Sequence, residues 1–83
     1  MQKGRNVIYG YASETINEYG LLAMREVTLA VEPATLRQLS AFLTSMADMI
    51  ESGQLTGHGH RHIDELVNDW EGGCDIIVAP PEE

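Results

Sequence analysis

Three histidines stand at alternate positions in the segment GHGHRH, and Asp64 continues the same spacing after His58, His60 and His62. Imidazole nitrogens and carboxylate oxygens are common ligands of transition metals. On a strand, alternate residues share a face, so His60, His62 and Asp64 would form a site of two histidines and one carboxylate. On a helix, residues two apart point to nearly opposite sides and cannot share an ion. The metal site is therefore the alternative, and the simpler interpretation is surface histidines that pair with acidic neighbours.

Other chemistry-bearing residues are few. Cys74 is the only cysteine, which excludes an internal disulfide, and its place at the start of an apolar segment predicts a buried, unreactive thiol. The chain has no glycine-rich phosphate loop, no C-x-x-C pair and no G-x-S-x-G element. Its carboxylates show no recognisable acid/base arrangement. We therefore predict a protein that is not an enzyme and that needs no cofactor.

The acidic residues are concentrated in the second half of the chain. The chain has 13 acidic and 5 basic residues, a formal charge of −8, and Arg61 is the only basic residue after Arg37. This charge argues against binding to nucleic acids or to anionic membranes.

A local acidic patch, with a tryptophan as a candidate anchor, would attract a basic protein: Asp64, Glu65, Asp69, Trp70 and Glu71. The other interpretation is a solvated surface that keeps a small protein soluble, with Trp70 packed in the core.

The clearest element is a helix over residues 33–52. Pro33 suits the first helical position because its missing N–H is not needed there, and Gly53 is a natural stop. Apolar residues recur at spacings of three and four and should pack on a sheet: Leu36, Leu39, Leu43, Met46 and Ile50. Phe42 and Met49 widen this stripe.

Four strands are predicted around this helix, near residues 6–12, 21–32, 58–64 and 74–79. The second has its apolar residues mainly at odd positions, so that face should line the core. The stretch 61–71 is ambiguous, since its apolar spacing also fits a short helix near residues 62–70. The prediction is an α+β fold in which a four-stranded, mostly antiparallel sheet carries one helix on one face, in the order ββαββ.

The length of 83 residues predicts a single domain over residues 1–83. Such a domain buries little surface, so a homodimer or another partner is a reasonable supplement. The start of the chain, MQKGRN, is polar and predicts a frayed lead-in without a signal peptide, and no apolar run reaches the roughly 20 residues of a membrane helix. A cytoplasmic location follows by default.

The succession EVTLAVEP, ATLRQLSAFLTSMADM, GHRHID, a tryptophan and DIIVAPP resembles the immunity protein 32 family of bacterial polymorphic toxin systems. The resemblance covers roughly residues 20–80. Its anchors are mainly apolar: Val27, Pro33, Leu36, Leu39, Phe42, Leu43, Met49, His60, His62, Asp64, Trp70, Asp75, Ile76, Ile77 and Val78. The resemblance implies a β-rich, non-catalytic inhibitor of a cognate toxin, a nuclease among the candidates, and favours a strand at the H-x-H-x-D segment.

Overall fold

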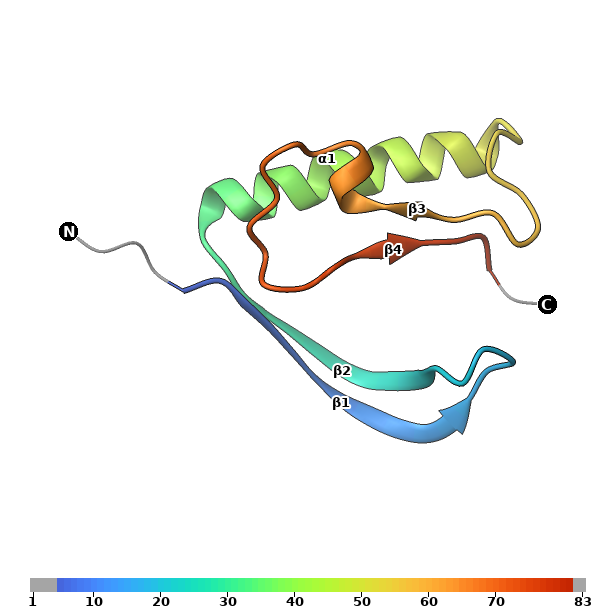
Figure 1. The fold of residues 1–83 in the computed structure, drawn as a ribbon, viewed down its shortest axis with the longest axis horizontal. Helices are drawn as coiled ribbons and strands as arrows, with labels where there is room; N and C mark the ends of the chain where they lie inside the picture. Colours follow the sequence, from blue (N-terminus) through green and yellow to red (C-terminus); the bar gives the residue numbers. More distant parts are fainter. Residues whose placement is uncertain (1–4, 82–83) are drawn as a thin grey trace.

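The computed structural model describes residues 5–81 and has the α+β composition that the sequence predicts (Figure 1). The elements in chain order are β1 (Val7–Ile16), β2 (Leu22–Ala30), α1 (Pro33–Glu51), β3 (Arg61–His62), the 3-10 helix η1 (Ile63–Glu65) and β4 (Ile77–Val78). The strands form two separate antiparallel sheets, β1–β2 and β3–β4, within the described part of the chain. The prediction of one four-stranded sheet is therefore wrong.

The first sheet is a long hairpin, as the predicted antiparallel pairing of the first two strands required. The register runs from Val7 opposite Ala30 to Ile16 opposite Leu22, so the first strand ends four residues later than predicted. Asn17 closes the turn, because its Oδ1 accepts the backbone N–H groups of Tyr19 and Leu21, both at 2.9 Å. Such side-chain-to-backbone bonds fix a turn locally and so align the strands that flank it.

The helix α1 begins at Pro33 and ends one residue before the predicted boundary. Gly53 has a φ of +80°, which turns the chain away where most side chains would be strained. The helix buries Leu39, Phe42 and Met46, but Leu36 and Leu43 are 43% and 46% exposed and do not pack under a sheet as predicted. Within residues 5–81, no helix is long and apolar enough to cross a lipid bilayer.

The second sheet is much shorter than predicted, because Arg61 pairs with Val78 and His62 with Ile77, and the pairing ends there. The predicted strands 58–64 and 74–79 shrink to two residues each. The helical turn of η1 starts directly after His62, and positive φ values at Gly57 and Gly73 take the flanking chain out of the extended conformation. The segment that fitted both a strand and a helix is thus a strand followed by a 3-10 turn.

The hydrophobic core lies between α1 and the C-terminal third of the chain. Its members are Leu39, Phe42, Met46, Leu55 and Ile63, and the partly buried residues packed on them are Met49, Ile50, Val67, Trp70, Ile76 and Val78. The hairpin contributes no residue to this cluster. All nine positions of β2 are exposed, so the prediction that its odd-numbered face lines the core is wrong.

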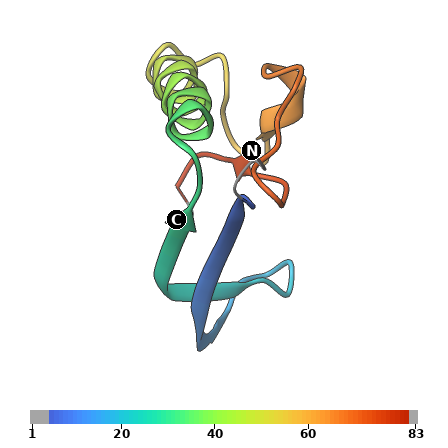
Figure 2. The same cartoon turned by 90° about the vertical axis from the view of Figure 1, so that its left-hand side faces the viewer.

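The hairpin lies apart from α1 and from the second sheet over most of its length, which both views show (Figure 1, Figure 2). At its base, Asn6 connects it to the start of α1, and at its tip the hydroxyl of Tyr19 is hydrogen-bonded to Nδ1 of His58 at 2.7 Å. The radius of gyration is 14.1 Å, against about 12 Å for a compact chain of this length. The structure is open, and most of its exposed large hydrophobic side chains lie on the hairpin.

Candidate partner-binding site

A polar hollow lies where the first turn of α1 meets the segment that follows η1. It has a volume of about 140 Å³ and is lined by Glu32, Ala34, Thr35, Gln38, Asp69 and Glu71. We call it the acidic hollow, because three of the residues that line it are carboxylates. Two of them, Asp69 and Glu71, belong to the acidic patch predicted from the sequence, whereas Glu32 was not predicted.

The walls of the acidic hollow are joined by Asn6, the residue before β1. Its Oδ1 accepts the backbone N–H of Glu32 at 2.8 Å, and its Nδ2 lies 3.2 Å from Oγ1 of Thr35 and 3.1 Å from the backbone oxygen of Glu71. The amide of Asn6 therefore holds the N-terminal end of α1 against Glu71, which lies 65 residues after Asn6 in the chain. The predicted frayed lead-in is wrong at Asn6, and its residues 1–4 lie outside the described residues.

The position of Asp69 is fixed by α1. The side-chain Nε2 of Gln38 donates to Oδ1 of Asp69 at 3.1 Å across the hollow. The carboxylate keeps further lone pairs that can accept hydrogen bonds from a cation. Carboxylates that line an open hollow are suited to a guanidinium or an ammonium group, since charge-assisted hydrogen bonds are the stronger kind.

The predicted acidic patch is divided in the structure. Asp69 and Glu71 line the acidic hollow, whereas Asp64 and Glu65 belong to η1 and do not. Trp70 lies between the two groups in sequence, packs against the core and donates from Nε1 to the backbone oxygen of Cys74 at 2.7 Å. The indole of Trp70 therefore packs against the core, which is one of the two interpretations that the sequence left open for it.

A second acidic group surrounds His62. Nδ1 of His62 lies 2.6 Å from Oδ2 of Asp75, and the backbone N–H of His62 donates to the Glu65 carboxylate at 2.6 Å. The hydrogen bond to Asp75 raises the pKa of His62 above its ordinary value of 6.5. Desolvation lowers this pKa, whereas the negative charges of Asp75, Glu65 and Asp64 raise it further. This is the pairing of a surface histidine with acidic neighbours that the sequence suggested.

The geometry does not support the alternative metal site. The rings of His60 and His62 are 5.2 Å apart between centroids and meet edge to face, but Asp64 lies in η1, where the alternation of a strand no longer applies. Among residues 5–81 no three His, Cys, Asp or Glu side chains are gathered in a way that could hold a metal ion. Cys74 is exposed, so its predicted burial is wrong.

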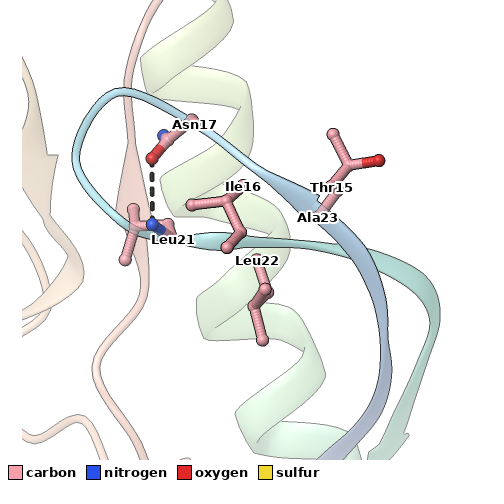
Figure 3. A pocket seen from close by; sticks show the side chains of 6 residues that line it. All are labelled: Thr15, Ile16, Asn17, Leu21, Leu22 and Ala23. Atoms are coloured by element: carbon pink, nitrogen blue, oxygen red, sulfur yellow. Dashed lines mark hydrogen bonds between the residues drawn. The ribbon is translucent and has the colours of Figure 1, made fainter.

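A larger hollow of about 420 Å³ lies at the tip of the hairpin (Figure 3). Its lining residues are Thr15, Ile16, Asn17, Leu21, Leu22 and Ala23, and the drawn hydrogen bond joins Asn17 to Leu21. None of these side chains titrates in the physiological range, so the tip offers apolar contact rather than acid/base chemistry. It belongs to the same exposed hairpin.

Comparison of the chain with protein-family models, with curated proteins and with solved structures finds no match. The likeness to the immunity protein 32 family therefore rests on the sequence segments given above.

Proposed function

We propose that the protein is a non-enzymatic, acidic binding protein that inhibits a basic protein partner, as an immunity protein inhibits its toxin. The observation that supports the proposal is the acidic hollow, where Glu32, Asp69 and Glu71 line one space of about 140 Å³. An arginine or lysine side chain of the partner would enter this hollow and donate hydrogen bonds to its carboxylates.

The charge of the whole chain supports the same choice of partner. Residues 31–81 contain eight acidic and two basic residues, so a positively charged surface would be attracted to this part of the molecule. Long-range attraction of this kind accelerates encounter, whereas the hollow gives the complex its orientation. Inhibition would then be steric and electrostatic, because the bound chain covers a basic cleft that otherwise receives a substrate.

The resemblance to immunity proteins suggests the class of partner. A toxin that acts on nucleic acid needs a positive cleft for its phosphate-bearing substrate, and an acidic protein can occupy such a cleft in its place. The proposal includes action in the cytoplasm, where the chain would meet such a toxin before the toxin reached its substrate. The one cysteine is exposed and forms no disulfide, as is usual in a reducing compartment.

The proposal can be tested with two variants that lose the same charge. The chain is immobilised and exposed to lysate of its source cells at about 50 mM and about 500 mM salt. The variant Asp69→Asn/Glu71→Gln removes two carboxylates from the acidic hollow, and Asp48→Asn/Glu51→Gln removes two exposed carboxylates near the end of α1. The retained protein is purified, and its activity is assayed with and without stoichiometric added chain.

The proposal predicts a basic protein that is retained at low salt, is released at high salt and loses its activity when the chain is added. The hollow variant should lose this retention, and the helix variant should keep it. Failure to retain a basic protein would contradict the proposal. Equal loss in both variants would show that overall charge acts alone and that the hollow has no special part.

A further inference from the structure

Most of the exposed large hydrophobic side chains lie on the β1–β2 hairpin: Tyr9, Tyr11, Ile16, Tyr19, Leu21, Leu22, Met24, Val27 and Leu29. Residues directly opposite each other in an antiparallel pair share a face, and so do alternate residues along a strand. The register gathers apolar residues of both strands on one side, which we call the hairpin face: Ile8, Gly10, Ala12, Met24, Val27 and Leu29. An apolar surface of this kind is a candidate for contact with another protein.

A bulge at Arg25 produces this face. Tyr11 is opposite Glu26 and Ala12 is opposite Met24, so Arg25 is left without an opposing residue. The extra residue brings Met24 to the side of Val27, although simple alternation would separate them. The side chain of Met24 lies over Gly10, where an added Cβ would be 2.9 Å from its sulfur. Met24 and Val27 are nevertheless both 55% exposed.

The amount of exposed surface corresponds to what a stable dimer covers. The chain has an accessible surface of 6469 Å², whereas a compact monomer of 9.2 kDa has about 4,900 Å². The excess is about 1,500 Å², and obligate homodimers bury about 1,000–2,500 Å² on each chain. A second chain on the hairpin would therefore bring the exposed surface to that of an ordinary folded protein.

The distribution of charge favours a second copy over a basic partner at this place. Residues 7–30, which form the hairpin, hold three glutamates and one arginine, a net charge of −2, whereas residues 31–81 hold eight acidic and two basic residues, a net charge of −6. Two copies of an acidic chain repel each other less when they meet through their less acidic parts. A basic partner would be drawn instead to the acidic hollow.

We infer that two copies of this chain form a homodimer in which their hairpin faces pack against each other. The dimer buries the apolar side chains of β2 and leaves the acidic hollow of each copy open. It is separate from the proposed function, since it uses another surface and needs no other protein.

The oligomeric state of the full chain tests the inference. Sedimentation velocity at about 100 µM should give twice the chain mass of 9.2 kDa. The variant Val27→Lys should give a folded monomer, because the dimer would bury an unpaired ammonium group. The matched control is Leu66→Lys, which places the same charge on an equally apolar residue, 45% exposed, at the end of η1. This control should remain dimeric.

A wild-type chain that stays monomeric at this concentration overturns the inference, and so does a dimer that Val27→Lys leaves intact. If Val27→Lys does not fold, the nearly isosteric Val27→Thr decides the question, because a hydroxyl buried in the interface should raise the dimer Kd about fivefold or more. An unchanged Kd in that variant overturns the inference. The variant Asp69→Asn/Glu71→Gln should keep the wild-type dimer Kd, so this inference and the proposed function fail separately.

Discussion

His62 and Asp75 form a short ion pair, 2.6 Å between Nδ1 and Oδ2, that joins the end of β3 to the segment leading into β4. The two strands share only two residue pairs, and this side-chain contact lies beyond them, next to the backbone hydrogen bond from the N–H of Ile63 to the carbonyl oxygen of Ile76. His62 is also the last residue of β3, directly before η1, and its backbone N–H donates to the carboxylate of Glu65. The pair therefore stabilises the point where the C-terminal segment folds back on itself.

The stability of the fold should depend on pH through this pair. Asp75 raises the pKa of His62, so the contribution is complete below the unfolded value of 6.5 and is lost as the pH rises through the higher folded value. Asp75→Asn should bring the pKa of His62 back toward 6.5 in an NMR titration and should reduce the loss of unfolding free energy between about pH 6 and about pH 8. The exposed Asp48→Asn is the control, and a titration of His62 that Asp75→Asn leaves unchanged would contradict the assignment.

Asn6→Ala should destabilise the protein more than its position near the chain start suggests. The change removes three hydrogen bonds, to Glu32, Thr35 and Glu71, and leaves their polar atoms without this partner. A loss of about 1–3 kcal/mol in the free energy of unfolding is expected from urea denaturation. The exposed Asn68→Ala should change it by less than about 0.5 kcal/mol. Equal effects in the two variants would rule out a structural role for the Asn6 amide.

The elements predicted correctly are those specified by local sequence. Pro33 and Gly53 delimit α1, and the apolar spacing between them identifies the helix without any tertiary information. The pairing of the first two strands also follows from neighbouring segments of chain. The carboxylates Asp69 and Glu71 were predicted as part of a binding surface from charge alone; the structure places both on the wall of one hollow, and their part in binding stays a prediction.

The features that were not predicted depend on contacts distant in sequence. The amide of Asn6 meets Glu71 across 65 residues, and no local pattern indicates that meeting. Alternation in residues 21–32 suggested one buried face, but the bulge at Arg25 changes which side chains share a face, and the core forms without the hairpin. Apolar periodicity therefore did not indicate that β2 would stay outside the core.

Gly72→Ala should be destabilising because the indole of Trp70 occupies the space that a Cβ would take. Gly72 is buried, so the ring cannot be displaced without disturbing the loop that its Nε1 holds through Cys74. Overpacking of this kind costs about 1–3 kcal/mol. In a Trp70→Ala background the same substitution should cost much less, and a double-mutant cycle with additive effects would show that the two residues are not in conflict.

Neighbouring residues on α1 should differ sharply in their tolerance of truncation. Phe42 is 1% exposed and central to the core, so Phe42→Ala should cost about 3–5 kcal/mol, enough to unfold a domain of marginal stability. Leu43 is half exposed, and Leu43→Ala should leave a folded protein with a slightly lower Tm by circular dichroism. If Leu43→Ala proved as damaging as Phe42→Ala, Leu43 would have to be covered in solution. A second chain that reaches this side of the helix would then have to lie on α1.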